Sequence, residues 1–249
     1  ETDLGGEGNL FEETERHARR VSLTSPILSQ GKFESILALN ESGLKVQVID
    51  ATYDPEVTTL KIALETLCQE AAAHVTGGAS VLVLSDRSIA EARLPIHSLL
   101  ATGAVHHHLI AHGLRADSNL IIETGSARDS HQVACLLGFG ATAIYPYLAY
   151  SVLTDQLNSG EILGAPSVCY KNYRKGINKG LLKIMSKMGI SAVNSYRGAQ
   201  LFEAVGLDTE VVEMAFRGVS SRIAGAGFAH LEFDQKQLAR TARLKRKPV

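Results

Sequence analysis

The sequence predicts an α/β protein with a mainly parallel sheet and flanking helices, followed by a C-terminal wrapping extension. The first observation is that short apolar runs, bounded by turn or cap residues, alternate with segments of helical spacing. The second is composition, since 45% hydrophobic and 20% charged residues in a chain of 249 are typical of a globular protein with a sizeable core. Alternating strands and helices favour parallel pairing through right-handed crossovers.

Five apolar runs are expected to form buried strands. Strands buried on both faces of a parallel sheet read as short, nearly continuous apolar runs. In chain order these runs are residues 46–51, 80–85, 120–123, 141–146 and 183–188. The pattern fits an open sheet and a partial barrel equally well.

Helices are expected between these runs. Residues 57–74 place their apolar side chains on one stripe, which Gly77 ends. Asp129 is a predicted N-cap, because its side chain can accept a hydrogen bond from the first turn of a helix that closes at Gly138. Helical spacing also covers residues 96–112, 151–157 and 173–182.

Three parts are expected along the chain. Residues 1–30 are polar and glycine-rich without a sustained period, which indicates a linker or arm. Residues 31–193 form the α/β domain. Residues 194–249 are expected to form a helical extension and linker toward a following domain, with short helices at 195–205 and 209–216 and a polar, basic helix from about Asp234.

Charge and cysteine content exclude several classes of function. A net charge of −1 provides no overall field that attracts nucleic acid or an anionic membrane. The basic run at residues 240–247 is interpreted as a solvated tail. No apolar run reaches 18 residues, so we expect neither a membrane span nor a signal peptide. Three separated cysteines without a C-x-x-C pair indicate buried thiols in a reducing compartment.

Three long motifs, in order, carry a family resemblance. The first is ETGSARDSH at residues 123–131, running into LLGFGA at 136–141. The second is YRKGINKGLLKIMSKMGIS at 173–191, and the third is SYRGAQLFEAVGL at 195–207. From about residue 9 to residue 233, the chain resembles the central domain of the large polypeptide of glutamate synthase, NADPH- or ferredoxin-dependent.

The resemblance implies a multi-domain oxidoreductase that makes glutamate from glutamine and 2-oxoglutarate. In that family, a glutaminase domain with an N-terminal Cys nucleophile releases ammonia. A barrel domain with FMN and an iron–sulfur cluster then reduces the imine of 2-oxoglutarate, and the central domain joins the two and helps to line the ammonia passage. Because this chain begins with Glu1 and lacks a close cysteine trio, we expect no catalytic, cofactor-binding or metal site in it, and an inactive fragment when isolated.

The resemblance also implies partners and a compartment. The glutaminase and FMN domains of the same polypeptide are the expected neighbours, with the FMN domain following residues 194–249. A small NADPH-oxidising subunit or ferredoxin is the implied electron donor, and no nucleic acid or membrane partner is expected. The expected location is the bacterial cytoplasm or a plastid.

The strand predicted at 141–146 points to a degenerate relative of the flavin-binding β/α barrels. In those barrels the strand ends in glycines, whose N–H groups approach the FMN phosphate at a helix N-terminus. Here it ends in Tyr145, Pro146 and Tyr147, so an N–H donor is missing and two phenol rings occupy the space of a phosphate. We therefore expect a closed phosphate site and no FMN binding.

Two polar clusters have plainer interpretations than catalysis. His108 and His112 lie four residues apart, as in two-His metal sites, but without a third ligand a helix surface is favoured. Ser126, Asp129 and His131 are the residue types of a hydrolytic triad, yet they lie too close in sequence to face one another.

One alternative function is an independent β/α enzyme acting on a small phosphorylated or carboxylated substrate. Its binding residues would be Glu123, Arg128 and Lys187. That function requires the fold to bring the three side chains to one place.

The junction of the second and third motifs is expected to form an inter-domain surface that lines the ammonia passage. Methionines and bulky apolar residues lie close to loop glycines there, which is typical of a surface that a partner covers. A cationic lining also disfavours protonation of passing ammonia. The residues are Met185, Ser186, Lys187, Met188, Gly189, Tyr196 and Arg197.

Overall fold

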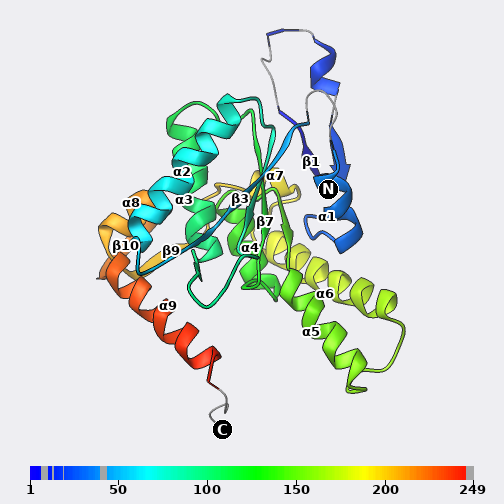
Figure 1. The fold of residues 1–249 in the computed structure, drawn as a ribbon. Coiled ribbons are helices and arrows are strands. Elements are labelled where there is room, and N and C mark those ends of the chain that lie inside the picture. The colour runs from blue at the N-terminus through cyan, green and yellow to red at the C-terminus, as the bar shows by residue number, and fades with distance from the viewer. Residues whose placement is uncertain (7–10, 13, 19, 40–43, 245–249) are drawn as a thin grey trace.

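A four-stranded parallel sheet lies at the centre of the computed structural model, which describes residues 1–6, 11–12, 14–18, 20–39 and 44–244 (Figure 1). The strand order is β3-β5-β7-β8, and every neighbouring pair is parallel. The bounds are β3 (Val46–Asp50), β5 (Val81–Ser85), β7 (Asn119–Glu123) and β8 (Ala143–Tyr145). The parallel sheet and four of the five predicted strands are confirmed, and the sheet is open.

Helices make the crossovers between these strands. Thr59 caps the first by accepting a hydrogen bond from the N–H of Ile62 (3.4 Å), and Asp129 caps the third by accepting one from the N–H of Gln132 (2.9 Å). Each cap satisfies an N–H group that the helix itself leaves without a partner. The predicted cap at Asp129 is confirmed, and the helices are α2 (Leu60–Thr76), α3 (Ser98–Ala111) and α4 (Ser130–Gly138).

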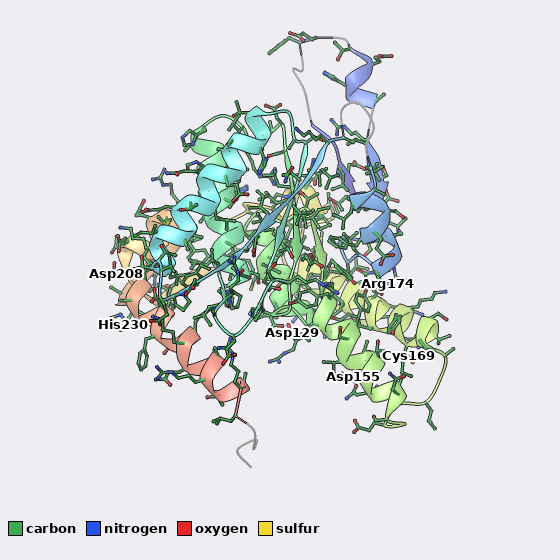
Figure 2. The ribbon with its side chains drawn as sticks, viewed as in Figure 1. Asp129, Asp155, Cys169, Arg174, Asp208 and His230 are labelled. Carbon is green, nitrogen blue, oxygen red and sulfur yellow. The ribbon has the colours of Figure 1, made fainter. Side chains whose placement is uncertain are left out.

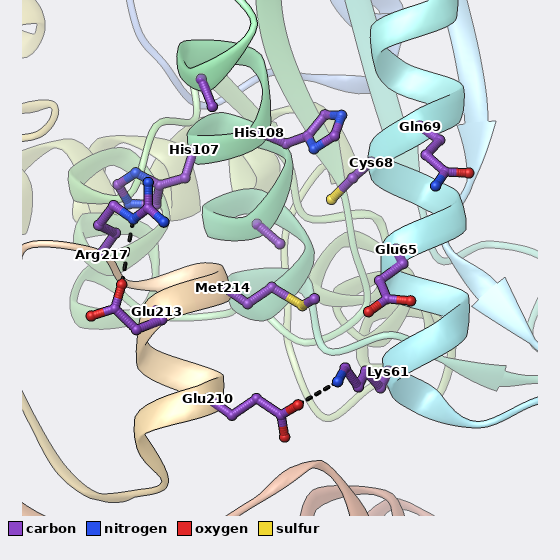
Figure 3. A pocket seen from close by; sticks show the side chains of 12 residues that line it. Lys61, Glu65, Cys68, Gln69, His107, His108, Glu210, Glu213, Met214 and Arg217 are labelled. Atoms are coloured by element: carbon purple, nitrogen blue, oxygen red, sulfur yellow. Dashed lines mark hydrogen bonds and ion pairs between the residues drawn. The ribbon is translucent and has the colours of Figure 1, made fainter.

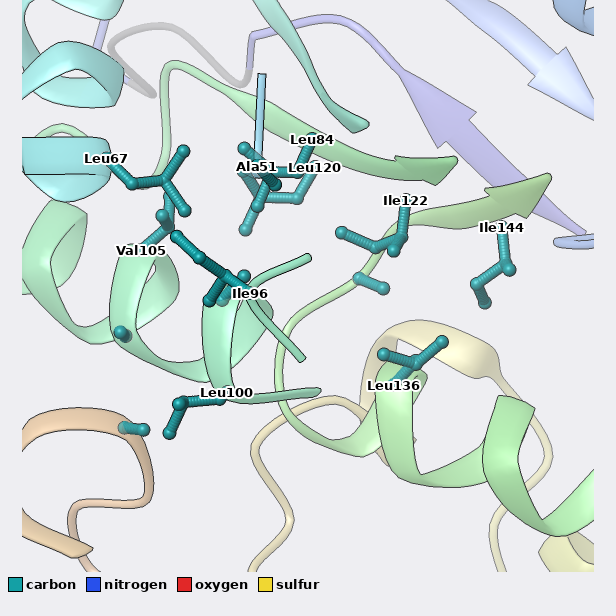
Figure 4. Packing of buried hydrophobic residues seen from close by; sticks show 14 of the residues in the cluster. Ala51, Leu67, Leu84, Ile96, Leu100, Val105, Leu120, Ile122, Leu136 and Ile144 are labelled. Atoms are coloured by element: carbon teal, nitrogen blue, oxygen red, sulfur yellow. The ribbon is translucent and has the colours of Figure 1, made fainter. Parts of the chain in front are cut away.

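Two apolar clusters cover the two faces of the sheet, because side chains alternate along each strand. On one face, Leu84 and Ile122 pack with side chains of α2, α3 and α4 (Figure 4). On the other face, Val83 and Ile121 pack with the N-terminal segment and with Tyr150 of α5 (Tyr147–Asn158). Burial on both faces explains why β5, β7 and β8 are almost entirely apolar, whereas the edge strand β3 leaves Val48 and Asp50 exposed.

The N-terminal segment, expected to form a linker or arm, contributes to the core where the structure describes it. Leu4, Leu23 and Leu28 are buried against the sheet. Residues 26–28 also pair with β8, since the N–H of Ile144 bonds to the carbonyl of Pro26 (2.8 Å). The elements are β1 (Thr2–Leu4), a 3-10 turn (Glu15–Ala18), β2 (Val21–Leu23), antiparallel to β1, and α1 (Gln30–Leu37). The division of the chain into three domains stays a prediction.

The fifth predicted strand, at residues 183–188, is wrong, because these residues lie in α6 (Pro166–Lys187). Ile177, Leu181 and Met185 of this helix recur every four residues and are buried. A short apolar run cannot distinguish a buried strand from the end of such a helix. α5 and α6 form a pair that projects from the sheet, with Asp155 and Cys169 in its outer half (Figure 2).

The C-terminal third contains a second, two-stranded parallel sheet. The helix predicted at 195–205 is wrong beyond residue 196, because residues 203–207 form a strand that pairs with a later one. The helix predicted at 209–216 is confirmed, and the terminal helix begins at Phe228, earlier than expected. In order, the elements are α7 (Val193–Tyr196), β9 (Glu203–Leu207), α8 (Thr209–Ala215), β10 (Ser220–Ala226) and α9 (Phe228–Ala242).

A short antiparallel pair, β4 (Thr52–Tyr53) with β6 (Leu94–Pro95), completes the strands of the described chain. Of the basic run predicted as a solvated tail, residues 245–247 lie outside the described residues. Within the described ranges, no helix combines the length and apolar character needed to cross a bilayer.

Candidate functional site

The predicted inter-domain residues lie where α6 ends and the chain turns to α7. α6 stops in a Schellman motif, in which the N–H of Gly189 bonds to the carbonyl of Ser186 (3.2 Å) and the N–H of Ile190 to that of Met185 (3.0 Å). Gly189 has a φ of +69°, a left-handed conformation that favours glycine. The motif therefore ends the helix sharply and fixes the direction of the following turn.

The seven predicted residues do not share one surface. Met185 and Tyr196 are 5% and 2% exposed and pack in the larger core cluster. Arg197 is half-buried and donates a hydrogen bond to the side chain of Asn194 (3.3 Å). The four that reach the surface are Ser186, Lys187, Met188 and Gly189. Their assignment to a passage lining stays a prediction, because the chain alone does not test it.

A buried carboxylate that sequence reasoning missed lies at the carboxyl end of the sheet. Asp86, which directly follows β5, is 5% exposed. It accepts hydrogen bonds from the hydroxyl of Thr124 (2.6 Å), the N–H of Gly125 (3.0 Å) and the hydroxyl of Tyr147. The carboxyl ends of neighbouring parallel strands meet at this position, which brings these groups together.

A second buried carboxylate lies beside the first. Glu123, the last residue of β7, is 7% exposed and accepts a hydrogen bond from the hydroxyl of Ser85 (2.7 Å). Its other oxygen pairs with the guanidinium of Arg87 (3.3 Å), which also lies 4.6 Å from the ring centre of Tyr147. We call these residues the carboxyl-end network: Ser85, Asp86, Arg87, Glu123, Thr124, Gly125 and Tyr147.

Burial dominates the electrostatics of the carboxyl-end network. Burial raises the pKa of Asp86 above its ordinary value, and the hydrogen bonds from Thr124, Tyr147 and Gly125 oppose that rise. Burial and the neighbouring Asp86 charge raise the pKa of the Tyr147 hydroxyl. Each acid therefore has donors of its own, and the network joins the ends of β5 and β7 to the start of α5.

The network does not fit the phosphate of FMN. The carboxylates of Asp86 and Glu123 would repel a phosphate group placed beside them. The Tyr147 hydroxyl also lies close to Gly125, since a Cβ built on this glycine would be 3.1 Å from it. Tyr145 stacks on Phe33 with ring centres 4.4 Å apart, and Pro146 offers no N–H at the start of α5. The absence of bound FMN stays a prediction, to which these contacts lend physical support.

The residue types of a hydrolytic triad do not assemble into one. The hydroxyl of Ser126 lies 2.9 Å from that of Thr124 and 2.8 Å from that of Ser98, so it belongs to a chain of hydroxyls. Asp129 caps α4, and His131 has the thiol of Cys135 as its neighbour (3.7 Å). These contacts agree with the plainer interpretation.

The three residues of the alternative enzyme are also separated. The hydroxyl of Tyr173 on α6 bonds to the carbonyl of Arg128 (3.0 Å), which places Arg128 near the middle of that helix. Lys187 lies 14 residues beyond Tyr173, or about 21 Å along the helix axis. Glu123 is occupied within the carboxyl-end network. The structure therefore does not favour a shared binding site for these residues.

A pocket of about 460 Å³ lies between α2, α3 and α8 (Figure 3). Two ion pairs lie in its lining, Lys61 with Glu210 and Arg217 with Glu213 (3.5 Å). Burial raises the pKa of the Cys68 thiol to about 12, so at neutral pH the group is a protonated thiol rather than a nucleophile. The pocket thus presents no activated nucleophile.

Among the histidines in and after α3, His106 is buried and His112 is the C-cap residue of the helix. Burial, together with the Arg115 charge, lowers the pKa of His106 to about 3, and Arg115 donates a hydrogen bond to its Nδ1 (2.9 Å). His112 Nδ1 lies 2.8 Å from the carbonyl of His108. Among the residues that the structure describes, no three His, Cys, Asp or Glu side chains are arranged to hold a metal ion.

Comparison with solved structures gives a weak similarity. A flavocytochrome b2 variant with benzoylformate aligns with 64% of this chain and 40% of its own, with a TM-score of 0.40 and 13% identity. This level is too low for an inference about flavin, so a relationship to flavin-binding barrels rests on the sequence motifs.

Comparison with known sequences is decisive. The model of the glutamate synthase central domain matches residues 1–208. The NADPH-dependent large chain from Bacillus subtilis is 41% identical over 90% of this chain and 14% of its own length. The NADH-dependent enzyme of Schizosaccharomyces pombe is 40% identical over 93% of this chain and 11% of its own length. The chloroplastic ferredoxin-dependent enzyme of Oryza sativa is 42% identical over 90% of this chain and 15% of its own length. This chain belongs to the glutamate synthase central domain family.

Proposed function

We propose that the chain joins the glutaminase and FMN domains of a glutamate synthase large chain and helps to line the passage for ammonia between them. The observation that carries this proposal is the exposed turn at residues 186–189, fixed by a Schellman motif and by a buried methionine within a motif of this family. The chain spans about one seventh of the B. subtilis relative, so most of such an enzyme lies outside it.

The parent enzyme would form glutamate from glutamine and 2-oxoglutarate, using FMN and an iron–sulfur cluster that other domains hold. Ferredoxin or a small NADPH-oxidising subunit would supply electrons, because the similar enzymes are named for ferredoxin, NADPH or NADH. A bacterial cytoplasm or a plastid would be its location, and the isolated chain would be inactive. This is the chemistry of an oxidoreductase acting on CH–NH2 donors.

The turn after α6 suits a passage wall for physical reasons. Met188 is 51% exposed and flexible, so it can repack against a neighbouring domain that moves. Lys187 adds a positive charge, which disfavours ammonium relative to neutral ammonia. Met185, buried one turn earlier, keeps the end of the helix in place.

The test is Lys187→Ala and Met188→Ala in the full-length enzyme, with glutaminase and synthase activities scored separately. A passage role predicts that both half-reactions survive while ammonia escapes into solvent and glutamate per glutamine falls. Lys32→Ala, at an exposed lysine of α1, is the matched control and should leave coupling unchanged. Loss of one half-reaction outright in Lys187→Ala would make Lys187 catalytic and contradict the proposal.

The inactivity of the isolated chain has a separate test. Equilibrium dialysis against FMN should show no binding, because the carboxyl-end network places acidic and phenolic groups at the end of the sheet, where they oppose a phosphate. A micromolar dissociation constant would refute this part of the proposal while leaving the linking role intact.

A further inference from the structure

Helix α6 carries two ridges that follow the same four-residue spacing. The first is the apolar ridge of Tyr173, Ile177, Leu181 and Met185, which are half-buried or buried. The second consists of exposed lysines only, which we call the lysine ridge: Lys171, Lys175, Lys179, Lys183 and Lys187.

The two ridges lie on opposite sides of the helix. Each lysine precedes a residue of the apolar ridge by two positions or follows one by two, which is a rotation of about 200° on a helix of 3.6 residues per turn. The apolar ridge faces α4, where the hydroxyl of Ser130 bonds to the carbonyl of Ile177 (3.3 Å) and Gly180 lies against Ser130. The lysine ridge therefore faces away from the body of the protein.

The charge of the lysine ridge is not balanced within the described chain. Helix α6 has six cationic side chains and no carboxylate, although the whole sequence has a net charge of −1. Several basic side chains elsewhere in the described chain pair with acids, as Lys236 does with Glu232 (2.8 Å). Among the described residues, none of the five ridge lysines has such a partner. Lysines four residues apart on a helix also repel one another.

We propose that the lysine ridge is a docking surface for an acidic face of another domain of the same glutamate synthase polypeptide. This inference rests on the proposed function, because it requires the chain to sit within the larger enzyme. The ridge ends at Lys187, the residue at which the exposed turn begins, so both features belong to one continuous surface.

The spacing of the ridge defines its partner. Successive lysines are separated by about 6 Å along the helix axis, and the five extend over about 24 Å. Carboxylates at every fourth residue of a helix repeat at the same interval, and those at every second residue of a strand repeat at about 6.6 Å. The partner face therefore carries a row of Asp or Glu on one helix or one strand.

Other polyanions fit this surface less well. A basic helix binds a membrane by inserting its apolar face, but the apolar ridge of α6 is packed inside the protein. Lysines can attract the phosphates of a nucleic acid, but specific and single-strand sites add the bidentate fork of arginine or stacking aromatic rings, which the lysine ridge lacks. Exposed apolar side chains beside the ridge, Val168, Leu182 and Met188, suit a protein interface.

The first experiment is zero-length carbodiimide cross-linking of the full-length enzyme, because this reagent joins lysine to carboxylate only when the two are in contact. We expect links from the ridge lysines to Asp or Glu outside these 249 residues, within one polypeptide. The pair Lys236–Glu232 is the internal control for reagent efficiency. Recovery of the control link without ridge links overturns the proposal, as do ridge links to a second copy of the enzyme.

The second experiment compares Lys175→Glu/Lys179→Glu/Lys183→Glu with the triple Lys→Arg variant, which keeps the charge. Cross-links from the remaining Lys171 and Lys187 should fall by about tenfold or more in the first variant and persist in the second, because attraction becomes repulsion. Equal links in both variants overturn the proposal. Retarded migration of duplex DNA, lost only in the glutamate variant and without inter-domain links, overturns it in favour of nucleic acid.

The outcomes also separate this inference from the proposed passage. Ridge links together with unchanged coupling in Lys187→Ala support docking and refute the passage lining. Lost coupling in Lys187→Ala without ridge links supports the passage lining and refutes docking through the lysine ridge.

Discussion

The carboxyl-end network and the lysine ridge both concentrate charge, and the chain treats them in opposite ways. In the network, Asp86 and Glu123 are buried, and each receives donors from its own neighbours. In the ridge, exposed lysines share one face, and no carboxylate of the described residues pairs with them. Burying a charge without partners raises the free energy of the folded state, because the charge loses its hydration. An exposed charge keeps its hydration and therefore needs no partner within the chain. We infer that the buried carboxylates with hydrogen-bond donors stabilise the fold, and that the exposed lysines without acid partners form a contact surface.

The largest expected effect is that of Asp86→Ala. The substitution leaves the Thr124 hydroxyl, the Gly125 N–H and the Tyr147 hydroxyl without their acceptor, so the free energy of unfolding should fall by about 3 kcal/mol. Urea denaturation measures this change. Asp155→Ala, at an exposed carboxylate of α5, should change stability by less than about 0.5 kcal/mol. A similar small loss for both variants would break the comparison.

The pH dependence of the same site sharpens the contrast. Because burial raises the pKa of Asp86 above 3.8, its stabilising contribution is complete below that value and is lost as pH rises through the folded-state pKa. The substitution Asp86→Asn introduces a side chain that stays neutral at every pH, so it should destabilise the protein more at about pH 4 than at about pH 7. Paired urea titrations in the same buffers measure the difference, and the opposite order would contradict it.

Two glycines on α6 distinguish its attached side from its free side. A Cβ at Gly180 would lie 2.0 Å from the Ser130 hydroxyl and 2.5 Å from its Cβ, so Gly180→Ala should push α6 from α4 and cost about 2 kcal/mol. A Cβ at Gly176 would meet no atom of the described residues within 4 Å beyond the helix's own backbone, and Gly176→Ala should stabilise by about 0.5–1 kcal/mol through helix propensity. Thermal denaturation of both variants checks this, and stabilisation by both would show that α6 is not held as described.

The smallest expected effect is a gain in stability on the lysine ridge, whereas substitution of Asp86 in the carboxyl-end network lowers stability. Lys179→Glu in the 249-residue chain replaces two repulsive pairs, with Lys175 and Lys183, by two attractive ones, and should stabilise it by about 0.5 kcal/mol. Lys179→Arg keeps the charge and should be neutral. Chemical denaturation at low salt measures the gain, which added salt should reduce. Destabilisation by Lys179→Glu would mean that the chain itself contains a partner for Lys179.

The parallel sheet was predictable because its signals are local. Apolar runs bounded by cap residues and glycines predicted β3, β5, β7 and β8. The N-cap at Asp129 was predicted because aspartate is a preferred residue at that position. Residues 183–188 were assigned to a strand although Lys183, Ser186 and Lys187 interrupt their apolar side chains, because six residues are too few to show a helical period. Over the longer segment from Tyr173 to Met185, apolar side chains recur every four residues, and this spacing indicates a helix. The N-terminal contacts were missed because Leu4, Leu23 and Leu28 reach the core through distant pairing.

The functional residues were less predictable for a related reason. Asp86 follows an apolar run but lies 38 residues before Thr124, its hydroxyl partner, and only the order of the strands brings the two together. Met185 and Tyr196 were expected at a surface since bulky residues near glycines fit a patch as well as a core. Which of the two they enter depends on the position of α4 and α7, and sequence spacing does not contain that information.

The backbone pairing of residues 26–28 with β8 bears on what the sheet presents to other chains. A parallel sheet of four strands has two lateral borders, and each border offers unpaired N–H and carbonyl groups to any passing extended chain. At the β8 border, Pro26 and Leu28 occupy these groups at Ile144. A version of the chain that starts after residue 30 would uncover an apolar strand ready for intermolecular pairing. We therefore expect residues 26–28 to hinder intermolecular pairing at this edge of the sheet.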